Sequence, residues 1–386
     1  MYKKNKIFFF YTGGLKRDVN IINNLSIKFK KIYFFTIGAD IHKLKAKKNL
    51  IITKPLILKI FLFIVSKLEN ILKFNSFLQY ISFVFIDFFY SIYFLSLFPD
   101  KNDIVIAENN ISSTILFICK IKKIKTILDV SNTHVVDKYN KISFSRSKKI
   151  SFYERLIIKR GLKEYKLANK ITVLSTNVYE TFKKHDPSLL YKITKIHSGI
   201  DTNIFNIKNE KKVFSICIVG VISKFKNVHN IFKVINSIKS KKLNILIIGN
   251  YDYSLKKIEI TNHKVTHFKS LDQKKLPFYY SRSKILCIGS YIEGMPKVVL
   301  EASACGIPTV GFEGSSISDI VIDNVNGYVL KNEDYKNLKK KILFLLNSNK
   351  YLSMGQNASK IISKNFSLLK YSERWNKNLI ELMKSK

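Results

Sequence analysis

The stretch Ser290–Phe312, SYIEGMPKVVLEASACGIPTVGF, follows the end of a strand and contains a short loop, a helix and another strand. We expect the helix to begin at Pro296, because the N–H that proline lacks has no partner in a first helical turn. Gly306 should end the helix, and Pro308 prevents its continuation. A strand, a helix and a strand in this order are typical of a parallel sheet with helical crossovers.

The same alternation of short apolar runs and longer helical patterns continues on both sides and predicts an α/β protein. In the first half of the chain, we expect strands at Lys6–Tyr11, Ile32–Ile37, Leu50–Thr53, Asp103–Ala107, Thr126–Val130, Lys170–Leu174 and Lys192–His197. In the second half, we expect them at Phe214–Val219, Leu243–Ile248, Val265–Phe268, Lys284–Ile288, Pro308–Gly311 and Gly327–Leu330. Polar Asn203–Lys212 interrupts the series once, and we expect a linker there.

The length of 386 residues suits two medium-sized domains better than one core. We therefore expect a Rossmann-like, doubly wound first domain over residues 1–205 and a second one over residues 206–365. Residues 366–386 have a helical pattern and carry the only tryptophan, Trp375. We expect this tail to pack back on the first domain.

The chain is strongly basic, since 67 Lys and Arg residues against 27 Asp and Glu residues give a net charge of +40. Such a charge attracts polyanions, among them phosphate-rich substrates, nucleic acid and anionic membranes. Nearly all of it comes from lysine, whereas the reading of bases favours the bidentate guanidinium of arginine. We therefore expect an anionic membrane surface as a partner and no nucleic acid.

The cysteines predict neither a disulfide nor a metal site. They are scattered, with no CxxC pair, at Cys119, Cys217, Cys287 and Cys305. This pattern is typical of reduced cysteines in a cytosolic protein. The N-terminal apolar run is short and leads directly into Gly13 and Gly14, which favours a first strand over a signal peptide.

The segment Phe77–Phe98 is almost unbroken Phe, Ile, Leu and Tyr, and its length permits a transmembrane helix. Expected strands of one sheet lie both before and after it, and a single crossing would separate them. We therefore expect Phe77–Phe98 and Leu56–Leu72 to form a helical pair, partly in the core and partly at a membrane surface. A helix simply buried in the domain remains the alternative.

Two glutamates mark the loop and the helix of the opening stretch. Loop amides and a helix N-terminus supply N–H groups for a phosphate or a sugar oxygen. Glu293 and Glu301 would repel a phosphate, but a carboxylate accepts hydrogen bonds from two adjacent hydroxyls. The stretch therefore predicts a site for a polyol and a phosphate. A solvated surface role for Glu301 is the alternative, although its neighbours in the helix are apolar.

The spacing Glu293-x7-Glu301 within EGMPKVVLEASACGIPTV resembles the signature of glycosyltransferase family 4, the glycosyl transferases group 1. The segments ANKITVLSTNVYETF, KIHSGIDTNIF, YYSRSKILCIGS and DIVIDNVNGYV are similar to other parts of that family. The resemblance implies a GT-B fold, in which two Rossmann-like domains face each other across a cleft. The first would bind the acceptor and the second the nucleotide-sugar donor.

The resemblance also assigns roles to the residues of the signature. Glu293 would approach the donor sugar, and Glu301 would hold the nucleotide ribose. The residues expected around the donor with them are Ser290, Gly294, Met295 and Pro296.

A second element, GVISKFKNVHNIFKV at Gly220–Val234, is where the family grips the donor diphosphate with an arginine and a lysine. Lys226 matches the lysine, but Val221 occupies the usual arginine position, which puts a bidentate grip in doubt. Lys224 is the best substitute, because a point charge still stabilises a departing diphosphate. The alternative is a solvated lysine-rich turn.

Two further loops follow expected strands of the first domain. Gly13 and Gly14 let the backbone form an anion nest, and the resemblance implies that they face the donor phosphates and the acceptor. In LDVSNTHVV at Leu128–Val136, polar residues follow a strand end, where open α/β sheets bind ligands. His134 is the nearest match to a histidine that the family places near the sugar, and a structural histidine remains the alternative.

No Asp-x-Asp pair for a metal ion occurs in the sequence. The resemblance implies metal-independent transfer from a UDP- or GDP-sugar with retention at the anomeric carbon, with no bound cofactor. We expect a glycan or lipid-linked acceptor in cell-surface polysaccharide or lipopolysaccharide synthesis, at the inner face of the plasma membrane. Another two-domain sugar-nucleotide enzyme, such as an epimerase or a phosphorylase, and a non-catalytic membrane-associated scaffold remain alternatives.

Overall fold

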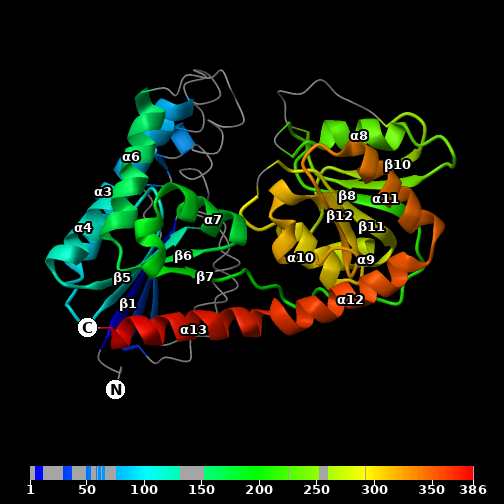
Figure 1. Cartoon of the computed structure of the whole chain (residues 1–386). Coiled ribbons are helices and arrows are strands. Elements are labelled where there is room, and N and C mark those ends of the chain that lie inside the picture. The colour runs from blue at the N-terminus through cyan, green and yellow to red at the C-terminus, as the bar shows by residue number, and fades with distance from the viewer. Residues whose placement is uncertain are drawn as a thin grey trace. The chain divides into compact units, whose positions relative to one another are not determined.

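The computed structural model describes residues 5–11, 29–36, 49–53, 58, 60–61, 63–65, 75–130, 152–224, 226–251, 260–291 and 293–385. The chain folds into two compact units (Figure 1). The first comprises Met1–Leu174, Val178–Ile196 and Ser372–Lys386, and the second comprises Ser175–Asn177 and His197–Tyr371.

Each unit contains one sheet in which every strand pair is parallel. The first sheet has the order β3-β2-β1-β4-β5-β6-β7. Its strands are β1 (Lys6–Tyr11), β2 (Lys31–Thr36), β3 (Leu50–Thr53), β4 (Ile104–Glu108), β5 (Lys125–Val130), β6 (Lys170–Val173) and β7 (Ile193–Lys195). The second sheet has the order β10-β9-β8-β11-β12-β13. Its strands are β8 (Phe214–Val219), β9 (Asn244–Ile248), β10 (Lys264–Phe268), β11 (Ser283–Ile288), β12 (Thr309–Phe312) and β13 (Gly327–Leu330).

The helices cover these sheets. Among the residues described in the first unit, the α-helices include α3 (Asn75–Ser96), α4 (Ser113–Ile121), α6 (Phe152–Leu167) and most of α7 (Thr176–His185). Those of the second unit are α8 (Val228–Asn236), α9 (Leu276–Ser281), α10 (Lys297–Ala304), α11 (Tyr335–Asn347) and α12 (Lys350–Asn365). A last helix, α13 (Leu368–Lys384), continues from the second unit into the first. Every strand expected from the sequence is present, with ends that differ by at most two residues, and the α/β fold class is confirmed.

The strands are almost continuously apolar because they are buried on both faces. In the first sheet, aromatic side chains stack across the β1–β2 pair. The ring centroids of Phe10 and Phe35 lie 4.5 Å apart, and those of Phe8 and Tyr33 lie 4.9 Å apart. In each sheet the strand order reverses once, between β1 and β4 and between β8 and β11. Ligands of doubly wound sheets bind beyond the carboxyl ends of the strands at such points.

The polar stretch Asn203–Lys212, where we expected the linker, lies inside the second unit. It is attached there by hydrogen bonds. The ammonium of Lys212 donates to the carbonyls of Ser281 and Ser283, each at 2.8 Å. Burial lowers the pKa of Lys212 to about 8, which reflects how far this charge has been withdrawn from water. These contacts attach the polar residues to the end of α9 and the start of β11.

The helix α3 is buried along one side and exposed along the other. Ile86, Tyr90 and Phe94 belong to the core, whereas Phe88 and Ile92 are 55% and 51% exposed. Among the described residues, only Phe77–Ser96 within α3 is long and apolar enough to cross a membrane by length and composition, which is weak evidence by itself. The strands β3 and β4, before and after it in the chain, belong to one sheet.

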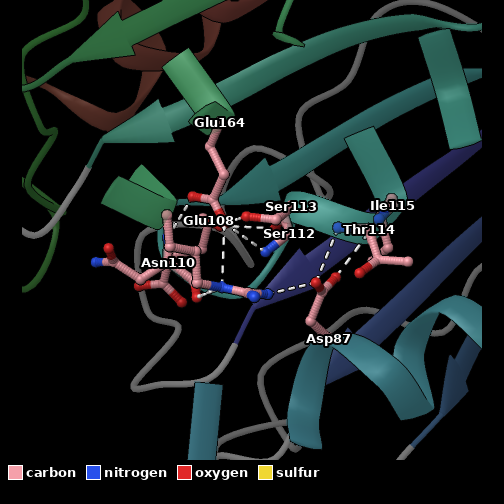
Figure 2. Close-up of polar contacts among 9 residues, drawn as sticks. Asp87, Glu108, Asn110, Ser112, Ser113, Thr114, Ile115 and Glu164 are labelled. Atoms are coloured by element: carbon pink, nitrogen blue, oxygen red, sulfur yellow. Dashed lines mark hydrogen bonds and ion pairs between the residues drawn. The ribbon is translucent and has the colours of Figure 1, made fainter. Parts of the chain in front are cut away.

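Buried charges connect α3, α4 and α6 (Figure 2). Glu164 of α6 accepts hydrogen bonds from the backbone N–H groups of Asn110 and Ser112, the latter at 2.9 Å. Asp87 of α3 accepts from the N–H of Thr114 at 2.8 Å and is paired with Arg160 of α6. Two carboxylates therefore satisfy the N-terminal end of α4, with one guanidinium beside them.

Burial raises the pKa of Glu164 from its ordinary value of 4.5 to about 7, although Arg160 and the two N–H donors oppose the shift. Between these pH values the folded protein holds a proton that the unfolded chain has released. Stability contributed by this group should therefore fall as the pH rises from about 4.5 to about 7, by about 1–3 kcal/mol. The difference in free energy of unfolding between the wild type and Glu164→Gln, measured in urea from pH 5 to pH 8, isolates this change. A difference that does not vary with pH would contradict it.

Candidate functional site

The site predicted in the second unit lies at the carboxyl ends of β8 and β11, where the order of the second sheet reverses. The two strands are paired, with Leu286 opposite Cys217. The loops that follow them, residues 220–227 and 289–296, therefore begin side by side. Residues 225 and 292 lie outside the described residues.

Two glycines allow these loops to pack closely. A Cβ at Gly289 would lie 2.9 Å from the side chain of Ile231, so the loop after β11 lies directly against α8. A Cβ at Gly249 would lie 1.9 Å from the carbonyl oxygen of Gly220, and the φ of Gly249 is +154°. Only glycine fits there, which lets the end of β9 approach the loop after β8.

The centre of the site is an ion pair between the two loops. The carboxylate of Glu293 accepts hydrogen bonds from the ammonium of Lys226 and from the hydroxyl of Ser290, the latter at 2.8 Å. The side chain of Glu293 is 17% exposed and that of Lys226 is 33% exposed, so both charges are within reach of a ligand. The hydroxyl of Ser316 donates to the backbone carbonyl of Glu293 and fixes the loop itself. The structure thus brings together Lys226, Ser290 and Glu293.

Glu301 lies on α10 and is buried, which excludes the solvated surface role. The hydroxyl of Tyr280 on α9 donates to its carboxylate at 3.0 Å. Burial, and then the charge of Glu301, raises the pKa of Tyr280 well above its ordinary value, so the phenol stays a hydrogen-bond donor. Burial, with Glu301 as the next cause, also raises the pKa of the Cys305 thiol to about 12.

The remaining predicted residues of the loop after β11 follow Glu293 in the chain, and their contacts with the donor stay a prediction. Met295 is buried, and its sulfur accepts a hydrogen bond from the N–H of Ser198 at 3.2 Å. Pro296 has an extended backbone and immediately precedes α10, so the helix begins one residue later than expected, at Lys297. Gly294 lies between Glu293 and Met295 and is partly exposed.

The first turn of α8 adds positive potential beside Lys226. Lys224 is exposed, and Asn227, with a φ of +55°, directly precedes the helix. His229 was not predicted from the sequence. Its Nδ1 is buried and has no hydrogen-bond partner among the described residues, and burial, with Lys233 and Lys224, lowers its pKa. A helix N-terminus with two lysines and a neutral histidine suits an anion.

Three predicted residues, Gly13, Gly14 and His134, lie outside the described residues, so their roles stay predictions. Within the described part of the first unit, Asp129 at the end of β5 accepts from the hydroxyl of Thr172 at 2.8 Å. Among the described residues, no group of three or more His, Cys, Asp and Glu side chains is arranged to hold a metal ion.

Residues 200–361 match the family model for glycosyl transferases group 1. An uncharacterized glycosyltransferase of Methanocaldococcus jannaschii is 26% identical over 64% of this chain and 62% of its own length. An alpha-1,4-N-acetyl-D-galactosaminyltransferase of Campylobacter jejuni, whose name gives a PP-undecaprenol-linked glycan, is 29% identical over 27% of this chain and 29% of its own. The matches thus span less than two thirds of these relatives.

The fold is shared with a solved structure over nearly the whole chain. Sucrose-phosphate synthase from Thermosynechococcus elongatus is similar with a TM-score of 0.71 and 14% identity, over 98% of this chain and 99% of that one. The two-unit Rossmann-like architecture of the GT-B class is therefore confirmed.

Proposed function

We propose, from the match of residues 200–361 to the family model for glycosyl transferases group 1, that the chain is a retaining glycosyltransferase using a nucleoside-diphosphate sugar. The donor is a UDP- or GDP-sugar, and the acceptor is a glycan or a lipid-linked glycan. The reaction belongs to the synthesis of a cell-surface polysaccharide at the inner face of the plasma membrane. The Lys226–Glu293 pair, at the carboxyl ends of β8 and β11, carries this proposal.

Lys226 and Glu293 suit two different parts of such a donor. The ammonium of Lys226, with Lys224 and the N-terminus of α8 beside it, binds the diphosphate. Glu293 then exchanges its bond with Lys226 for the hydroxyls of the sugar. Both side chains are partly exposed, so the exchange requires no unfolding of the site.

In the reaction, the bond between the anomeric carbon and the diphosphate oxygen breaks, and a bond to the acceptor oxygen forms on the same face. The acceptor proton passes to the departing phosphate oxygen. Lys226 and the oriented N–H groups of α8 stabilise the negative charge that develops on that oxygen. Gly13, Gly14 and His134 remain the residues that we propose for the acceptor side.

The role proposed for Glu301 is to accept hydrogen bonds from the nucleotide ribose. Glu301→Ala should weaken binding of the free nucleoside diphosphate about ten- to a hundredfold, because one charged acceptor is worth about 1.5–3 kcal/mol. Isothermal titration calorimetry measures this directly. Glu180→Ala, which removes an exposed glutamate of α7, serves as the control. Affinity in Glu301→Ala equal to that of the control would remove the ribose role.

A thermal-shift screen against UDP, GDP, ADP and their sugars tests the proposed donor class. We expect stabilisation by one nucleoside diphosphate, and release of that diphosphate only when an acceptor is added. Release that does not depend on an acceptor would favour another sugar-nucleotide enzyme. Stabilisation by none of these nucleotides would contradict the transferase.

A further inference from the structure

The outer side of α3 is an uncharged apolar stripe. Val84, Phe88, Ile92 and Leu95 follow one another at helical spacing and are exposed by 39%, 55%, 51% and 43%. The one charged residue of this helix, Asp87, is buried and bound to Arg160. No charge on α3 itself therefore interrupts the exposed stripe.

The neighbouring helix α4 continues the pattern. Phe117 and Ile121, four residues apart, are exposed by 47% and 66%, while Ile115 and Cys119 point into the core. Asp87 of α3 accepts a hydrogen bond from the N–H of Thr114, so the two helices are packed directly together. The exposed residues of α4 therefore extend the stripe of α3.

The exposed sides of α3 and α4 both face away from the first sheet. Core residues of both helices, such as Tyr90 and Ile115, belong to one cluster with Phe8 and Phe10 of β1, so both helices cover the same face of the first sheet (Figure 1). The exposed residues lie on the opposite sides of these helices, away from that sheet. Together, the six side chains Val84, Phe88, Ile92, Leu95, Phe117 and Ile121 form what we call the apolar face.

Lysines border the apolar face. Lys120, Lys122 and Lys123, on and after α4, are exposed. The ammonium of Lys163 on α6 lies 5.6 Å from the centre of the Phe117 ring. The helix α4 contains no acidic residue. Aromatic and aliphatic side chains bordered by lysines complement the acyl chains and the phosphates of an anionic lipid surface.

We propose that the apolar face docks the first unit onto an anionic membrane surface, with α3 and α4 lying at the level of the headgroups. The helix α3 does not cross the bilayer, because β3 and β4 on either side of it belong to one sheet and Asp87 is fixed in the folded unit. This inference deepens the proposed membrane location and rests on it. The vesicle assay contains no donor or acceptor, and the donor screen contains no lipid. Failure of the membrane proposal can therefore be distinguished from failure of the proposed transferase function.

The test is sedimentation of the full chain with vesicles of phosphatidylcholine mixed with phosphatidylglycerol, and with vesicles of phosphatidylcholine alone. We expect binding to the mixed vesicles, weakened by salt, and little binding to the neutral ones. The double variant Phe88→Ser, Ile92→Ser should bind the mixed vesicles about a hundredfold more weakly. The triple variant Lys120→Gln, Lys122→Gln, Lys123→Gln should bind them at least about tenfold more weakly.

The matched control is Leu352→Ser, Leu369→Ser, which removes two equally exposed apolar side chains of the second unit. It should bind vesicles as the wild type does, and all variants should keep the thermal stability of the wild type. Binding by the Phe88→Ser, Ile92→Ser variant equal to that of the control would overturn the proposal. The proposal would also be overturned if the wild type did not bind vesicles and instead formed a dimer that the Phe88→Ser, Ile92→Ser variant does not form. Retention of the wild type in vesicles after alkaline extraction would overturn it as well.

Discussion

Lys226→Ala is expected to lower kcat by about a hundred- to a thousandfold, the range found when one preorganised donor to a developing oxyanion is removed. The ammonium of Lys226 forms an ion pair with Glu293 in this site. No arginine stands at position 221 to share the negative charge of the departing diphosphate. The measurement is acceptor-dependent release of the nucleoside diphosphate, followed over a range of donor concentrations.

The control for Lys226→Ala is Lys233→Ala, which removes an exposed lysine of the same loop-and-helix element. Glu293→Gln keeps the shape of the carboxylate but not its charge and should also lower kcat. Because the two side chains are in contact, the double variant should lose less than the product of the two single losses. A Lys226→Ala enzyme as active as Lys233→Ala would contradict the role of this lysine.

Arg160→Met is expected to destabilise the first unit by about 3–5 kcal/mol, because it leaves buried carboxylates without their cation. The guanidinium of Arg160 pairs with Asp87 and donates from Nε to the carbonyl of Asn110 at 2.9 Å. The carboxylate of Glu164 lies 3.9 Å from the same nitrogen. Methionine fills a similar volume, so the loss reports the charge rather than a cavity.

Urea unfolding followed by tryptophan fluorescence suits this measurement. Trp375 is the only tryptophan and is buried in the part of α13 that belongs to the first unit. Arg155→Met, at an exposed position of the same helix, is the control. Equal urea midpoints for Arg160→Met and Arg155→Met would show that the buried carboxyl groups of Asp87 and Glu164 do not require the charge of Arg160 for stability.

Much of the fold could be predicted because each strand is a short, buried apolar run, and such runs are visible in the sequence. Lys226 and Glu293 were each predicted to contact the donor shortly after an expected strand, whereas their contact with each other follows from the pairing of β8 with β11. The stretch Asn203–Lys212, predicted as a linker, falls within the second unit, and polar composition does not reveal that Lys212 donates to carbonyls of that unit.

Contacts between side chains from distant helices were not predicted. Arg160 and Glu164 are four residues apart on α6, but the Asp87–Arg160 pair and the Tyr280–Glu301 hydrogen bond join residues whose spacing follows no local period. A charged residue inside an otherwise apolar helix was the one available signal, and it was present at Asp87. Nothing in the sequence distinguished Tyr280 from the many other tyrosines of this chain.

The first unit is assembled from parts of the chain that flank the second. Residues 372–386 belong to it, and there Lys170 of β6 bonds to Glu381 at 2.9 Å and to Asn378 at 3.2 Å. A ribosome therefore releases the strands of the first sheet well before Trp375, Leu379 and Leu382, which supply part of its buried apolar surface. During synthesis the first unit therefore cannot complete its fold, and exposes apolar surface to which chaperones can bind, until the whole second unit has been synthesised.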